Sequence, residues 1–93
     1  MGKSNGARTM ASIECQTMNG MFPHEVGVLI QGADRWYESM VDSELVTALD
    51  QSTGRIPVEV VERDRDVKRV LIQLPRQVIA GGRRIWVNES AVK

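Results

Sequence analysis

RIPVEVVERDRDVKRVLIQL, residues 55–74, is the stretch that determines the fold class of this 93-residue chain. Apolar and polar side chains alternate over residues 56–62 with the period that a half-buried strand requires. Charges of alternating sign follow in residues 62–66, which is typical of a solvated turn, and residues 67–74 then resume the alternation. The pattern therefore predicts two antiparallel strands that bury one face. The residues expected on that face are Ile56, Val58, Val60, Val70, Ile72 and Leu74.

Shorter stretches on both sides of this hairpin indicate further strands. Asn19-Gly20 predicts a turn after the first strand, because both residues tolerate positive φ. Gly81-Gly82 predicts a two-residue turn in a hairpin of residues 77–80 with 83–87. Pro57 near the start of its strand predicts an edge position, since proline cannot donate to a ladder. The additional strands are expected at residues 9–18, 25–31, 35–41, 77–80 and 83–87, with a half-strand at 90–93.

Two local points stay open. Residues 35–41 have apolar side chains on both faces, so the pattern does not determine which face is buried. The two alternatives are a face with Trp36 and Met40 and a face with Tyr37 and Val41. Residues 42–49 fit a short helix that begins at Asp42 or Ser43, but Val46 and Thr47 also fit an extended segment.

Together these elements predict a mainly β chain: a small five- or six-stranded antiparallel barrel or sandwich with at most one short helix near residues 42–49. Short strands at regular spacing are typical of that architecture. Its size class is that of SH3-like and OB-like domains. Residues 9–93 are expected to form a single domain, and residues 1–8 a disordered tail because they offer little to bury.

Composition narrows the function classes. The chain carries 12 Lys and Arg against 12 Asp and Glu, so no net charge attracts it to nucleic acid or to a membrane. The charge is nevertheless polarised along the sequence. Residues 34–54 contain five acidic residues and one basic residue, whereas residues 55–93 contain nine basic and five acidic residues.

Catalytic and metal-binding residues are scarce. A single cysteine, Cys15, excludes an internal disulfide. With a single histidine, His24, it also disfavours a structural zinc site. Cys15 is expected in the core as a small hydrophobe, and His24 in a loop, so a small enzyme with a reactive Cys15 or His24 is the least favoured interpretation. We expect no enzyme activity, no cofactor and no metal. No apolar run fits a membrane span or a signal peptide, which predicts a cytoplasmic protein without membrane contact.

Two groups of residues suggest binding. Arg76, Arg83 and Arg84 surround the expected C-terminal hairpin near Trp86, a combination that can bind an anion or nucleic acid. The plain alternative is that these arginines only solvate and protect an edge strand.

The second group consists of apolar residues opposite the expected core faces, where a protein partner or a second copy of the chain could cover them. They are Leu29, Val61, Leu71 and Ile79. The sequence therefore predicts a non-enzymatic interaction module that binds another protein or itself, with a nucleic-acid-binding small barrel as the alternative.

Overall fold

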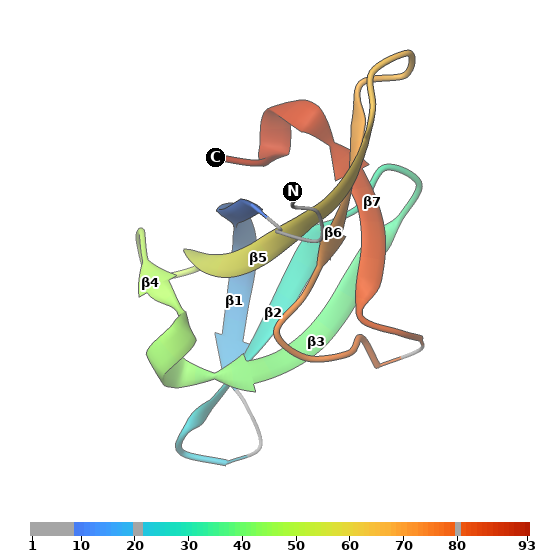
Figure 1. Cartoon of the computed structure of the whole chain (residues 1–93). Coiled ribbons are helices and arrows are strands. Elements are labelled where there is room, and N and C mark those ends of the chain that lie inside the picture. Colours follow the sequence, from blue (N-terminus) through green and yellow to red (C-terminus); the bar gives the residue numbers. More distant parts are fainter. Residues whose placement is uncertain (1–8, 20–21, 80) are drawn as a thin grey trace, which may run out of the picture.

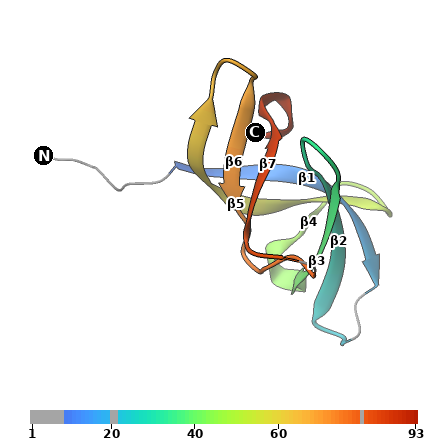
Figure 2. The same cartoon turned by 90° about the vertical axis from the view of Figure 1, so that its right-hand side faces the viewer.

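A computed structural model of the chain describes residues 9–19, 22–79 and 81–93. Its strands form one antiparallel sheet in the order β3-β2-β1-β5-β6-β7, and the two-residue strand β4 pairs with β5 off this path. The sheet curls into a half-barrel around its apolar inner face (Figures 1 and 2). The expected mainly β, small antiparallel architecture is confirmed. The strands are β1 (Thr9–Asn19), β2 (Glu25–Gln31), β3 (Trp36–Asp42), β4 (Thr47–Ala48), β5 (Thr53–Asp64), β6 (Arg69–Gln73) and β7 (Arg84–Asn88).

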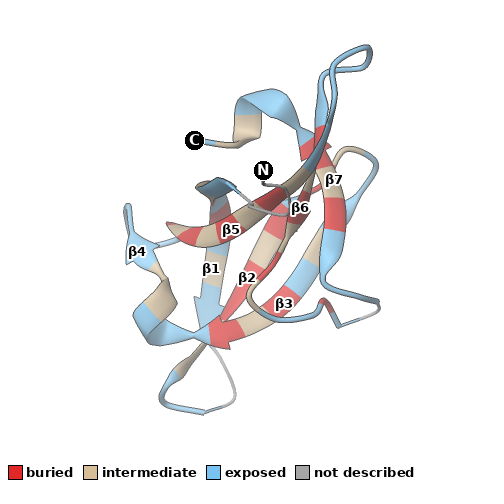
Figure 3. Ribbon diagram, viewed as in Figure 1, coloured by how far each residue is buried: buried red, intermediate tan, exposed pale blue. Residues whose placement is uncertain are grey.

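The alternating pattern of residues 55–74 produces the long hairpin of β5 and β6. All six residues that the pattern places on the inner face are buried, and Figure 3 shows the buried positions along the inside of the curl. At the turn, the Asp64 carboxylate accepts the backbone N–H of Asp66 at 3.1 Å. The turn closes through Lys68, whose φ is 55°. A shift in register between Val60 and Glu62 makes Val61 the extra residue of a bulge.

Pro57 lies inside the sheet and not in an edge strand, so that expectation is wrong for β5 as a whole. Its Cα partner on one side is Ser12 of β1. On the other side, β4 reaches only residues 54–55 and β6 only residues 59–64. A proline is tolerated here because the strand is locally unpaired on that second side.

Long-range backbone contacts join the two ends of the sheet. The N–H of Ala33, in the turn between β2 and β3, donates to the Trp86 carbonyl of β7 at 2.8 Å. The segment between β6 and β7 runs beside β3, where Val78 and Ser39 form a bridge. At the C-terminal end, the N–H of Lys93 donates to the Ser12 carbonyl at 2.9 Å. The expected half-strand at residues 90–93 is thus reduced to this short pairing with β1, after a turn of 3-10 helix, η2 (Glu89–Ala91).

The predicted hairpin of residues 77–80 with 83–87 is wrong. β7 pairs with β6, and no residue of 77–79 belongs to a strand. Neither Gly81 nor Gly82 has the positive φ of a primed turn. Pairing with β6 is favoured over the local hairpin because it places Ile85 and Val87 in the core beside Ile72 and Val70.

Residues 42–49 combine both alternatives that the sequence left open. Residues Ser43–Leu45 form a single turn of 3-10 helix, η1, and Thr47 and Ala48 are extended as β4. η1 is too short to have stability of its own, but Val46, which follows it, packs against the core cluster.

The expected tail, residues 1–8, lies outside the described residues. Within the described ones, the helical segments η1 and η2 have three residues each, and no helix has the length and apolar character to span a membrane.

Candidate functional site

The outer side of β1, β2 and β3 carries a group of apolar side chains that the core does not use. Antiparallel register places Met18 of β1 and Met40 of β3 on either side of Gly27. The same register aligns Leu29 with Glu38, and the Ile79 N–H donates to the Glu38 carbonyl at 2.9 Å. We name this surface the Met–Trp face; it consists of Met18, Leu29, Trp36, Met40 and Ile79.

Solvent reaches much of this face. The exposed fractions are 38% for Met18, 49% for Trp36 and 65% for Ile79, whereas Leu29 and Met40 are half-buried. Gly27 adds no side chain of its own, and the two methionines close over it. A Cβ there would lie 3.0 Å from Met18 Cγ and 3.6 Å from Met40 Sδ. Such unbranched thioether side chains adapt readily to the shape of a partner.

The charged residues that share this side of β1–β3 are acidic. Glu14, which is exposed, is 3.8 Å from the half-buried Arg55, which is a weak ion pair. Glu25 is 3.5 Å from Arg76. Glu38 and Asp42, both exposed and both on β3, form no ion pair with another described residue.

A hollow of about 360 Å³ opens at the Trp36 end of the Met–Trp face. Trp36 and Gln31 line it from the β2–β3 side, Glu14 from β1, and Ala91 and Lys93 from the C-terminal segment. The hollow forms where β1 changes partners, because β2 pairs with residues 16–19 of β1 and the C-terminal segment with residues 12–13. Its indole wall and polar rim suit a side chain of a partner.

The four apolar residues expected at an interface fall on two separate surfaces. Leu29 and Ile79 belong to the Met–Trp face. Val61 and Leu71 are half-buried on the outer side of β5 and β6, where Leu71 is the Cα partner of Trp86 on β7. These two pairs do not form one interface.

The arginines predicted to bind an anion are all engaged within the chain. Arg83 donates to the carbonyls of Leu74 at 3.1 Å and Pro75 at 3.2 Å, so it ties the ends of the β6–β7 connection. Arg84 donates to the Gln73 side chain at 3.0 Å. Arg84 and Trp86 share the outer side of β7, whereas Arg76 pairs with Glu25 at the edge of the Met–Trp face.

Cys15 is a core residue, as the sequence predicted. It is 4% exposed, and its thiol donates to the Gly54 carbonyl at 3.6 Å. Burial, with a smaller contribution from Glu14, raises the pKa of the Cys15 thiol to about 11, which disfavours the reactive thiolate.

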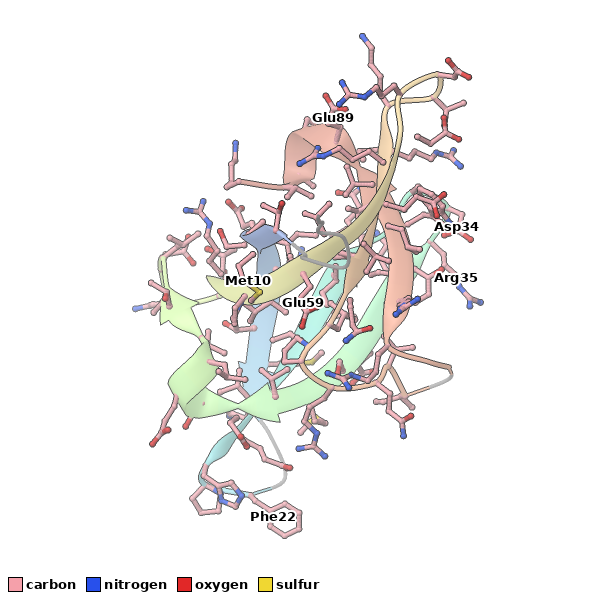
Figure 4. All side chains as sticks on the ribbon, in the orientation of Figure 1. Met10, Phe22, Asp34, Arg35, Glu59 and Glu89 are labelled. Carbon is pink, nitrogen blue, oxygen red and sulfur yellow. The ribbon has the colours of Figure 1, made fainter. Side chains whose placement is uncertain are left out.

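His24 is exposed beside β2 and its ring stacks on Phe22. Phe22 projects from the connection between β1 and β2, at one end of the molecule (Figure 4).

No group of three or more His, Cys, Asp or Glu side chains that could hold a metal ion occurs in residues 9–19, 22–79 and 81–93.

Comparison with known proteins adds no relative: no family model, curated protein or solved structure matches this chain.

The sequence missed Met18, Trp36 and Met40 as members of the surface. In β3, Tyr37, Ser39 and Val41 face inward, and the polar Ser39 in the middle of that row hid the alternation. Ser39 is buried because its hydroxyl donates to the Gln77 carbonyl at 2.9 Å. The signal for the outer row was the pairing in space of Met18, Gly27 and Met40, which requires the strand register.

Proposed function

We propose that this chain is a non-enzymatic interaction module that binds another protein through the Met–Trp face. The observation that carries the proposal is the gathering of exposed and half-buried apolar side chains from three neighbouring strands and from Ile79. Single exposed apolar residues are ordinary on protein surfaces, but several on neighbouring strands with a polar surround are typical of interaction sites. Tryptophan and methionine are also enriched at the centres of protein interfaces.

The test compares two substitutions that add the same charge at similarly exposed positions. Ile79→Glu changes the Met–Trp face, and Val67→Glu changes the tip of the β5–β6 hairpin, where Val67 is 57% exposed. Each tagged variant and the wild type are used to isolate partners from the native host. A partner that co-purifies is then produced alone and its affinity for all three chains is measured by calorimetry.

We expect one partner to bind the wild type and Val67→Glu alike and to bind Ile79→Glu at least about 10-fold more weakly, because a charge replaces a buried apolar contact. Circular dichroism of both variants checks that the fold is intact. Equal binding by both variants, or no protein that rebinds the purified wild type, contradicts the proposal.

A nucleic-acid-binding barrel is the second candidate, and the placement of Arg84 and Trp86 on one side of β7 favours it. An aromatic ring beside a guanidinium group can stack a base and contact a phosphate. The test measures binding of labelled single-stranded DNA and RNA at several salt concentrations. Replacing Arg83 and Arg84 by alanine should weaken binding and flatten the salt slope by about two if each contacts a phosphate. No binding at low salt eliminates this candidate.

A further inference from the structure

We propose that the segment bound by the Met–Trp face is basic as well as apolar: a stretch of another protein in which Lys or Arg side chains alternate with apolar ones. This inference rests on the proposed function, since it specifies the chemistry of the partner that the same face binds.

The position of Glu38 carries the argument. Its Cα is paired with that of Leu29 on one side, and its carbonyl accepts the Ile79 N–H on the other. A partner that covers both apolar neighbours therefore removes water from the Glu38 carboxylate as well. Burying an unpaired carboxylate is costly unless a cation arrives with the partner. No described residue forms an ion pair with Glu38, so the cation has to come from the bound chain.

Two other acidic groups extend this requirement along the face. Asp42 lies two residues beyond Met40 on β3 and is exposed. Glu14 lines the hollow beside Trp36 at the opposite end, and its contact with Arg55 spans 3.8 Å. A Lys or Arg side chain that enters this hollow would lie against an indole ring, which attracts cations. Lys93, on the rim of the same hollow, offsets only the charge at that end.

A second copy of the chain fits this face poorly. In a two-fold dimer the same surface meets itself, so the carboxylates of Glu38 and Asp42 from both copies would lie within one interface. Arg76, a basic residue at the edge of this surface, is already paired with Glu25. Like charges placed opposite each other oppose association. The acidic surround therefore favours a basic partner over self-association.

The test uses two labelled 18-residue amphipathic peptides, one of leucine and lysine and one of leucine and glutamate, with affinities measured by fluorescence anisotropy. The protein is the wild type, Glu38→Gln, or the matched control Glu62→Gln, which neutralises an exposed glutamate of β5 outside the Met–Trp face. We expect the lysine peptide to bind the wild type at least about 10-fold more tightly than the glutamate peptide. Glu38→Gln should weaken lysine-peptide binding about 5-fold, with no change for Glu62→Gln.

Equal affinity for the two peptides, or equal effects of Glu38→Gln and Glu62→Gln, overturns the inference, as does a stable dimer of the wild type that Ile79→Glu dissociates. These results are distinguishable from failure of the proposed function. A natural partner that Ile79→Glu releases, but that binds through an acidic or uncharged segment, keeps the function and refutes this chemistry. If Ile79→Glu releases no partner, both proposals fail.

Discussion

Ser39 is a buried hydroxyl in a sheet interior that is otherwise apolar. Its hydroxyl donates to the Gln77 carbonyl at 2.9 Å and so holds the β6–β7 connection against β3. Replacing Ser39 by alanine leaves that carbonyl without its donor, and we expect the free energy of unfolding to fall by about 1–2 kcal/mol. Urea unfolding measures the loss. Ser43→Ala, at an exposed position of η1, is the control and should change stability by less than about 0.5 kcal/mol. Equal effects would show that the bond contributes nothing.

Cys15 makes the stability of the protein depend on pH in the alkaline range. Burial raises the pKa of its thiol from 9.0 to about 11, so the folded state holds this proton more tightly than the unfolded state does. The resulting stabilisation is complete below pH 9 and disappears as pH rises through 11, a loss of about 3 kcal/mol at most. Other groups titrate in the same range, so the measurement compares wild type with Cys15→Ala. The stability advantage of the wild type should shrink from pH 8 to pH 10.5. A constant difference contradicts the assignment.

The alternation of apolar and polar residues predicted the buried face correctly wherever a strand buried one row of apolar side chains. For that reason the six residues expected on the inner face of the β5–β6 hairpin are all buried. The pattern left the buried face of residues 35–41 open, because burial of Ser39 depends on the hydrogen bond that its hydroxyl donates to the Gln77 carbonyl, 38 residues away in sequence. No local pattern contains that information.

Among the glycines that the structure describes, Gly32 in the turn between β2 and β3 has the tightest packing. A Cβ at Gly32 would lie 2.4 Å from Tyr37 Cε2 and 2.7 Å from the Arg35 carbonyl. The turn also places Ala33 against β7, and Figure 4 shows Asp34 and Arg35 beside that strand. Gly32→Ala should therefore destabilise the protein by about 1–3 kcal/mol through steric overlap. Gly82→Ala meets no atom within 4 Å and is the matched control. Thermal unfolding of both variants measures the effect, and equal melting temperatures would contradict this packing.

The positions of the long strands were predictable from the sequence, but the strand expected at residues 77–80 does not form and the partner of β7 was not predicted. Gly81-Gly82 predicted a local hairpin, whereas β7 pairs with β6 across the intervening residues. Local turn chemistry competes with burial, and the pairing of Ile85 with Ile72 and of Val87 with Val70 is the stronger effect, because it buries both strands on the core side. Arg83 then stabilises the displaced connection through its bonds to Leu74 and Pro75. The anion site was predicted on a hairpin of residues 77–80 with 83–87. That hairpin does not form, because β7 pairs with β6.

At the scale of the whole molecule, the curl of the sheet separates residues that the sequence grouped together. Leu29 and Ile79 come to one side, and Val61 and Leu71 to another. Which outward residues become neighbours depends on strand pairing, and that pairing can join strands far apart in the sequence. β1, for example, pairs with both β2 and β5. The candidate site therefore could be predicted only in part, through Leu29 and Ile79.

The acidic residues of the Met–Trp face should also control the oligomeric state of the isolated chain. With Glu38 and Asp42 charged, two copies that met through this face would oppose like charges in an apolar contact. We expect sedimentation velocity to show a 10.4 kDa monomer for the wild type at micromolar concentration. The double variant Glu38→Gln/Asp42→Asn keeps the apolar residues and removes the repulsion, so it should self-associate at lower concentration than the wild type. Glu62→Gln removes a charge elsewhere and should remain monomeric. A double variant that stays monomeric wherever the wild type does would show that charge does not hold two copies apart at this face.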